Sequence, residues 1–222
     1  MSISATSKLS GKVALRSPYL SVTTPNGSSY GGSQTWFSDA LIRGYGCGLI
    51  AAHDLFHYIH PTQETTFSTV ETYQQSVKKL RPFFPILPRL GMNGLMLMIG
   101  LNLLFLLKRM PERAVWHIGY RNTGREIANL LHQDLPVILS IGNNFPLIWK
   151  KDRLPLYQKN AHGDFVKTSS VRAHYVTVTG IEHGWLRISS WGQEWYINWS
   201  EYRHFSRKKS CPLFSNICYI RR

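Results

Sequence analysis

Acidic side chains are scarce in this sequence: 12 Asp and Glu residues stand against 26 Lys and Arg residues, and the net charge is +14. A surface with such an excess attracts polyanions and anionic membranes. The basic residues are spread along the chain, however, and no helix-turn-helix or zinc-finger spacing accompanies them. The composition therefore does not indicate a dedicated nucleic-acid-binding protein, while it leaves open an anionic partner or a membrane surface.

Cysteine is almost absent, with only Cys47, Cys211 and Cys218. An odd number of cysteines without metal-ligand spacing indicates neither a disulfide framework nor a zinc site, and we do not expect Cys211 to pair with Cys218. Residues 1–12 also lack the apolar core of an export signal. Both observations favour a cytoplasmic location, where thiols stay reduced.

The sequence also has no apolar run that could cross a bilayer. The strongly apolar stretch 94–109 is shorter than the roughly 20 residues that a membrane span needs, and Asn102 interrupts it. A buried central helix is the better interpretation. Because no internal repeat or low-complexity tract is present either, we expect a single domain spanning residues 1–222.

Apolar periodicity and capping residues predict an α+β fold in which helices come first and strands last. The lead-in 1–33 reads as irregular or strand-like, and residues 142–172 read as a long polar loop. The division is a mainly helical lobe over about 31–135 and a mainly β lobe over about 136–222. Helices are expected from Cys47 to Pro61, over 68–80 with a Ser68–Glu71 capping box, over 94–109 with Asn93 as N-cap, and from Asn122 or Thr123 through Leu131. Strands are expected over 114–120, 136–141, 194–199 and 217–220. Two further strands, 174–181 and 185–189, are expected to form a hairpin.

The candidate nucleophile is Cys47, which lies between Gly46 and Gly48 at the start of the first predicted helix. The positive end of a helix favours a thiolate, so we expect a lowered pKa for this thiol. Glycines on both sides permit a tight turn and let a substrate backbone approach the sulfur. A buried cysteine that merely packs is the alternative, and a partner histidine has to decide between the two.

That partner is His174, which begins the predicted hairpin and lies on the other lobe. An imidazole across a cleft can take the thiol proton, and the resulting ion pair would hold the sulfur ready for acyl transfer. His53, His57 and His60 share one helix face, but no carboxylate-histidine motif completes a metal site there. We therefore expect neither a metal nor a cofactor.

Four segments, in this order, resemble the papain-like cysteine peptidases: GYGCGLIAAHDLF, LPVILSIG, AHYVTVTGI and SSWGQEWYINWSEY. The resemblance is closest to the bacteriocin-leader-peptidase-like, or double-glycine peptidase-like, branch. It implies a papain-like fold and a cysteine peptidase or related thiol hydrolase that acts on a peptide or protein substrate without a cofactor.

The resemblance also implies roles for individual residues. Ser189, or Ser190 if the turn differs by one residue, stands where the family has the Asn or Asp that orients the histidine, and Trp191 would shield the ion pair from water. Gln34 would be the oxyanion donor, although it lies 47 − 34 = 13 positions before the cysteine and requires an insertion through residues 38–43. These departures leave an alternative: an inactive papain-like fold that binds a partner through its cleft and basic surface.

Overall fold

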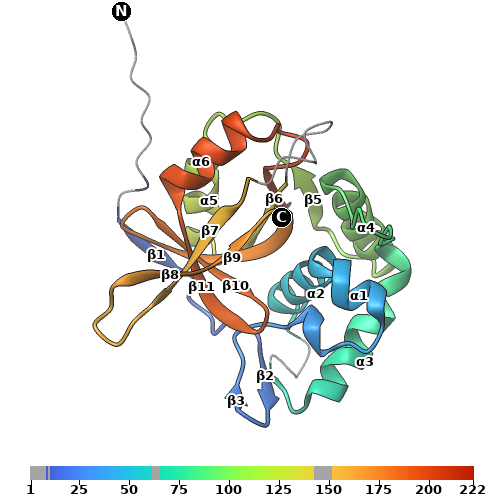
Figure 1. The fold of residues 1–222 in the computed structure, drawn as a ribbon. Coiled ribbons are helices and arrows are strands. Elements are labelled where there is room, and N and C mark those ends of the chain that lie inside the picture. Colours follow the sequence, from blue (N-terminus) through green and yellow to red (C-terminus); the bar gives the residue numbers. More distant parts are fainter. Residues whose placement is uncertain (1–8, 10, 62–65, 143–151) are drawn as a thin grey trace, which may run out of the picture.

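The protein has an α+β architecture, seen in a computed structural model that describes residues 9, 11–61, 66–142 and 152–222 (Figure 1). Its helices are α1 (Ala40–Tyr45), α2 (Cys47–Ile59), α3 (Val70–Leu80), α4 (Gly94–Leu107), α5 (Thr123–His132) and α6 (Trp199–Lys208), with short 3-10 turns η1 (Gln34–Trp36) and η2 (Arg81–Phe83). Its strands are β1 (Lys12–Ala14), β2 (Ser21–Thr24), β3 (Gly27–Ser28), β4 (Thr66–Phe67), β5 (Arg113–Trp116), β6 (Val137–Ile141), β7 (Leu154–Lys159), β8 (Phe165–Val171), β9 (His174–Glu182), β10 (Trp185–Ser190), β11 (Gln193–Asn198) and β12 (Ile217–Arg221).

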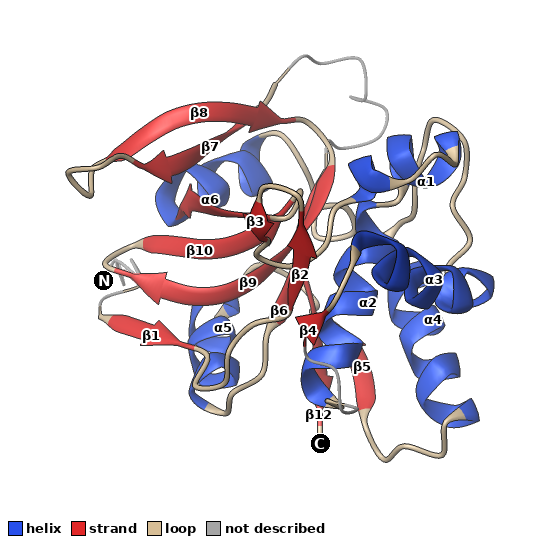
Figure 2. Cartoon of the chain, turned by 90° about the horizontal axis from the view of Figure 1, so that it is seen from below, coloured by secondary structure: helices blue, strands red, loops and turns tan. Residues whose placement is uncertain are grey.

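A large antiparallel sheet forms one half of the molecule. Its strand order is β5-β12-β6-β9-β10-β11-β7-β8, and β1 pairs with the far end of β9. Strands β2, β3 and β4 form a separate small sheet, in which β2 and β4 run parallel. Figure 2 shows helices α1 to α4 gathered on one side and the large sheet, with α5 and α6, on the other.

The central helix α2 connects these two halves because it packs directly on β6 and β9. Its residues from Gly48 to Leu55 are all buried, as are all five residues of β6. A strand buried on both faces is expected to be continuously apolar, which explains the Val-Ile-Leu run of β6. Helix α2 is therefore a fixed support for the residue at its first turn.

The structure confirms the α+β class and most of the predicted elements. Asn93 caps α4 by accepting a hydrogen bond from the Met96 N–H, and the predicted hairpin is β9 and β10. The free thiols of Cys211 and Cys218 agree with the expected absence of a disulfide between them. No helix in the described ranges has both the length and the apolar character that a membrane span requires.

Three expectations are wrong. The supposed loop 142–172 contains β7 and β8, whose Gln and Ser side chains are half-buried and whose Lys side chains are exposed. Residues 143–151 lie outside the described part. The capping box of α3 is formed by Thr69 and Thr72, one residue later than the Ser68–Glu71 pair. The strand predicted over 114–120 ends earlier, at Trp116.

Two short helices, α1 and α6, were not anticipated from the sequence. Asp39 caps α1, and Asn198 caps α6, each by accepting hydrogen bonds from two backbone N–H groups. Strand β5, which lies in the range expected to be mainly helical, joins the large sheet by pairing with β12. Helix α1 has the greater consequence, since it lies directly before Cys47.

Candidate active site

Cys47 is the first residue of α2, at the point where two helices meet. Gly46 ends α1 and also precedes the first turn of α2. The thiol is half-buried and lies at the helix N-terminus, where backbone N–H groups have no partner within the helix. The local sequence therefore places the sulfur at the end of a rigid helix, as expected.

Close packing explains the two glycines that flank Cys47, whereas the sequence suggested that they give a substrate access to the sulfur. A Cβ at Gly46 would lie 2.5 Å from the carbonyl oxygen of Ile42, so the close approach of α1 requires glycine. A Cβ at Gly48 would meet Met92 and Tyr175 at 3.2 Å. Both glycines are buried, and neither lines the pocket described below.

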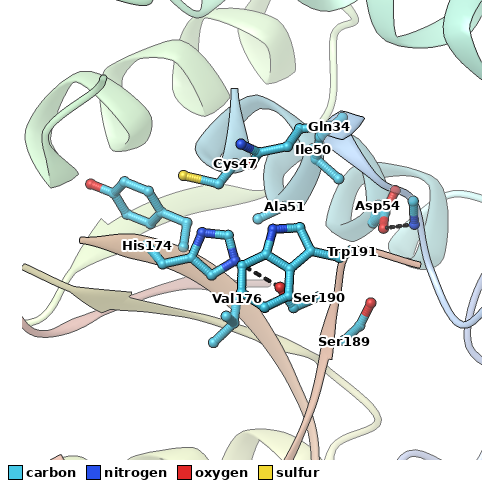
Figure 3. Close-up of a pocket in the computed structure, with 12 residues that line it drawn as sticks. Gln34, Cys47, Ile50, Ala51, Asp54, His174, Val176, Ser189, Ser190 and Trp191 are labelled. Atoms are coloured by element: carbon cyan, nitrogen blue, oxygen red, sulfur yellow. Dashed lines mark hydrogen bonds between the residues drawn. The ribbon is translucent and has the colours of Figure 1, made fainter. Parts of the chain in front are cut away.

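Gln34 reaches the same place from η1. Helix α1 occupies half of the chain between Gln34 and Cys47, which accounts for their separation in sequence. The Gln34 Nε2 donates a hydrogen bond to the Arg43 carbonyl oxygen at 2.9 Å, which fixes the amide. Gln34 and Cys47 both line one small pocket (Figure 3).

His174 enters this pocket from the sheet, as the first residue of β9. Its Nε2 lies 2.7 Å from Ser190 Oγ. The Trp191 ring stacks on the imidazole, with centroids 4.6 Å apart and an interplanar angle of 23°. Trp191 has a positive φ of 51° in the turn after β10, and this conformation turns its ring back over the histidine.

Only one of the two candidate serines contacts the histidine. Neighbouring residues of a strand point to opposite faces, so Ser189 and Ser190 cannot both face His174. Ser189 Oγ instead donates to the Tyr30 carbonyl oxygen at 2.8 Å. Of the two alternatives that the sequence left open, the structure therefore places Ser190 beside the imidazole.

One face of α2 forms the helical wall of the pocket. Cys47, Ile50, Ala51 and Asp54 line it and follow the spacing i, i+3, i+4, i+7 of a single helix face. The opposite wall comes from β9, β10 and the turn after β10, with His174, Tyr175, Val176, Ser189, Ser190 and Trp191. Figure 3 shows the sulfur and the imidazole on the same side of this pocket.

The electrostatics of the site differ from the expected ion pair. Burial raises the pKa of the Cys47 thiol, and backbone N–H groups of Tyr175, Gly48 and Cys47 only partly oppose this. Burial also lowers the pKa of His174 to about 4. Burial therefore favours the neutral form of both groups, and the pKa of the Cys47 thiol shifts in the direction opposite to that expected from the helix start.

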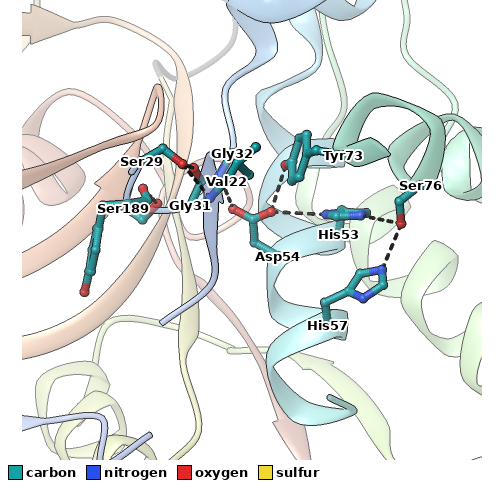
Figure 4. A network of polar contacts seen from close by, with 11 residues as sticks. Val22, Ser29, Gly31, Gly32, His53, Asp54, His57, Tyr73, Ser76 and Ser189 are labelled. Atoms are coloured by element: carbon teal, nitrogen blue, oxygen red, sulfur yellow. Dashed lines mark hydrogen bonds and ion pairs between the residues drawn. The ribbon is translucent and has the colours of Figure 1, made fainter. Parts of the chain in front are cut away.

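Asp54 lines the pocket and also lies at the centre of a network of polar contacts (Figure 4). One carboxyl oxygen accepts the Gly32 N–H at 2.8 Å, and the other accepts the Tyr73 hydroxyl at 2.8 Å and lies 3.2 Å from His53 Nδ1. The side chain is almost fully buried. Asp54 thus joins α2 to α3 and to the segment just before Gln34.

Glycine is required at two positions beside this carboxylate. A Cβ at Gly31, which has a φ of 76°, would lie 2.2 Å from Ser189 Oγ. A Cβ at Gly32 would lie 1.7 Å from the Tyr73 hydroxyl oxygen. The Gly31-Gly32 backbone therefore passes between β10 and the helices at a distance that only glycine permits.

The three histidines of α2 have protein partners. His53 Nε2 and His57 Nε2 lie 2.9 Å and 3.1 Å from Ser76 Oγ, and His60 Nε2 lies 3.3 Å from a carboxyl oxygen of Glu112. Within the described ranges, no group of three His, Cys, Asp or Glu side chains has the arrangement of a metal site.

Asp54 and Gly32 also line the pocket, although the sequence pattern did not predict this. The signal for Asp54 was available, since it lies seven residues after Cys47 on the same face of a buried helix.

Comparisons with family models, with curated proteins and with solved structures gave no match.

Proposed function

We propose that this protein is a thiol-dependent hydrolase of amide or acyl bonds, a papain-like cysteine peptidase in the sense of the resemblance described above. The observation that carries the proposal is the meeting of Cys47 and His174 in one pocket, with Ser190 and Trp191 holding the imidazole. A nucleophile, a base and a group that orients the base are the parts that covalent acyl transfer needs.

The proton transfers follow from the hydrogen bond at Nε2. If Nε2 carries the proton and donates it to Ser190, Nδ1 has a free lone pair that accepts the proton of the Cys47 thiol. The sulfur then attacks the carbonyl carbon of the substrate. Because both groups are neutral at rest, the proton moves as the carbon–sulfur bond forms. The imidazolium returns this proton to the leaving amine, and water hydrolyses the thioester.

The developing oxyanion has two donors within the pocket. The Cys47 backbone N–H lies at the first turn of α2, where it has no intrahelical partner. A glutamine amide has two N–H bonds, and Arg43 occupies one of those of Gln34. The remaining N–H can stabilise the oxyanion, and such donors typically contribute a factor of about 10² to 10³ in rate.

The test is hydrolysis of a library of peptides and peptidyl amides that includes Gly-Gly sequences, followed by mass spectrometry. We expect cleavage by the wild-type chain and none by Cys47→Ala or His174→Ala. If the wild type cleaves nothing, or if Cys47→Ala cleaves equally well, the hydrolase proposal is overturned.

The second candidate is a binding module that keeps this pocket without turnover. The raised pKa of Cys47 and the neutral serine at the third position favour it, because both reduce the reactivity of the sulfur. It predicts that Cys47→Ala binds the same peptides as the wild type and that neither protein cleaves them.

The cytoplasmic location of the protein also stays a prediction.

A further inference from the structure

Helix α4 is apolar on all sides, although one of its faces is not covered by the described part of the chain. Gly94, Leu97, Gly100, Leu101, Leu104 and Phe105 form its buried face. The opposite face consists of Leu95, Ile99, Leu103, Leu106 and Leu107, and we call these five residues the outer face of α4. Ile99, Leu106 and Leu107 are 60%, 65% and 63% exposed.

This exposure is unusual for a helix of such composition. A surface helix normally presents polar side chains to water, and a helix that is apolar all round is expected to be covered. The only polar side chain within α4 is Asn102, which lies beside the outer face and bonds both the N–H and the carbonyl oxygen of Ala114. The outer face therefore offers a contiguous aliphatic surface without a hydrogen-bonding side chain.

The charges around α4 are of one sign. The chain from residue 72 to residue 111 contains no Asp or Glu. Lys108, Arg109 and Arg113 follow the C-terminal end of the helix and are exposed, whereas the intervening Glu112 is buried against His60. The turn before the helix exposes Arg89 as well. An aliphatic face flanked by cations at both ends suits an anionic lipid surface.

We propose that the outer face of α4 docks this protein on an anionic lipid bilayer, with the helix lying in the plane of the interface. At 14 residues α4 is too short to span the bilayer, whereas its leucines can enter the boundary between head groups and acyl chains. The basic residues at the helix ends would contact anionic head groups.

A second copy of the chain fits the same face less well. Two copies that meet through α4 would bring cations together in either orientation, because Lys108 and Arg109 follow one end of the helix and Arg89 precedes the other, and like charges oppose such contact. A protein partner normally meets aromatic and hydrogen-bonding anchors, which the outer face lacks. The aliphatic composition and the single sign of charge therefore favour lipid.

The test is flotation of the full chain with vesicles of phosphatidylcholine alone or with added phosphatidylserine, at low and high salt. We expect binding to the anionic vesicles that weakens with salt. Leu106→Gln should weaken it about tenfold, since one inserted leucine side chain is removed from the lipid. The matched control is Val166→Gln on β8, which alters an exposed aliphatic residue far from α4 (Figure 1) and should bind like the wild type.

A second pair of variants tests the charge. The double variant K108Q/R109Q should weaken vesicle binding by roughly tenfold or more, because each cation near the surface contributes to the attraction. The control K167Q/R172Q removes the same charge from the β7–β8 side and should have little effect. Circular dichroism and thermal melting establish that each variant is folded.

Three results would overturn the proposal. One is the absence of binding to anionic vesicles at low salt. Another is equal weakening by the α4 variants and their controls, which would indicate attraction by net charge alone. The third is a dimer in sedimentation experiments that Leu106→Gln dissociates, which would assign the outer face to a second copy of the chain.

Discussion

Ser190 Oγ lies 2.7 Å from His174 Nε2, in a hydrogen bond buried beneath the Trp191 ring. This contact fixes which imidazole nitrogen is available to the thiol. We expect Ser190→Ala to lower kcat/KM about tenfold with little change in KM, because the imidazole loses its orienting partner and a net hydrogen bond contributes roughly 1 kcal/mol. Steady-state kinetics on a cleaved peptide measures this.

The matched control is Ser189→Ala on the same strand. Ser189 bonds the Tyr30 carbonyl oxygen and not the imidazole, so its loss should reduce stability more than turnover. Equal losses of kcat for the two alanine variants would contradict the assignment of Ser190. Ser190→Asn should retain activity, since an amide oxygen also accepts the Nε2 proton.

The pH dependence of Cys47 alkylation should show that the thiol and the His174 imidazole are both neutral at rest. Because burial raises the pKa of this thiol above its ordinary value, the thiolate fraction should rise about tenfold per pH unit between pH 6 and 8. Alkylation by iodoacetamide, followed at Cys47 by mass spectrometry, should rise in the same proportion. A rate that stays flat over this range would instead indicate a thiolate–imidazolium pair.

The free energy of unfolding should fall in mild acid. His174 has a pKa of about 4 in the folded chain and an ordinary value of 6.5, so between these values the unfolded chain binds more protons. Stability is therefore complete above pH 6.5 and is lost as the pH falls toward 4. Between pH 7 and pH 5 this residue alone should cost about 2 kcal/mol.

Urea denaturation at the two pH values measures this loss. His174→Gln has no imidazole at that position and should show a correspondingly smaller difference. His57, whose pKa burial also lowers to about 4, should account for part of the remainder. An unchanged pH dependence in His174→Gln would show that this histidine is not buried in its neutral form.

Asp54 should be among the most sensitive positions for stability. Asp54→Ala leaves the Gly32 N–H, the Tyr73 hydroxyl and His53 without their buried partner, and we expect a loss of about 3 kcal/mol or more. Tyr73→Phe removes only one of these hydrogen bonds and should cost less. A smaller loss for Asp54→Ala than for Tyr73→Phe would contradict the central position of the carboxylate.

Two glycines provide a further comparison. Gly32→Ala should destabilise the fold severely, because its Cβ would overlap the Tyr73 hydroxyl. Gly44→Ala, within α1, meets nothing within 4 Å and should be neutral or stabilising by up to about 1 kcal/mol. Thermal unfolding of both variants measures the difference, and similar melting temperatures would argue against the close passage at Gly32.

The sequence predicted the buried elements well because their patterns are local. The apolar run of β6, the turn between β9 and β10 and the cap of α4 each depend on neighbouring residues. The sequence did not predict the hairpin of β7 and β8, because its place in the sheet depends on a distant strand. Its polar side chains resemble those of a loop, and only pairing with β11 makes it part of the sheet.

Several of the residues that line the pocket were predictable from the sequence, but Gly32 and Asp54 were not predicted, and neither were the pKa shifts. The spacing of Cys47 and His174 suggested two halves that meet, and the structure brings both into one pocket. The choice between Ser189 and Ser190 depends on the pleat of β10, which a one-residue shift reverses. The raised pKa of Cys47 could not be foreseen, because desolvation depends on distant segments such as β9.

Strand β12 lies between β5 and β6, so the order in which the sheet can assemble differs from the order in which its strands are synthesised. Strand β5 pairs only with β12 among the described strands, and the start of β12 lies 217 − 116 = 101 positions after the end of β5. Until residues 217–221 pair with it, β5 has no hydrogen-bonded neighbour among the described strands. Such long-range pairing slows folding and leaves the unpaired edge open to aggregation. A chaperone would therefore be most useful in the interval after β6 and β9 have paired and before β12 has joined β5 to β6.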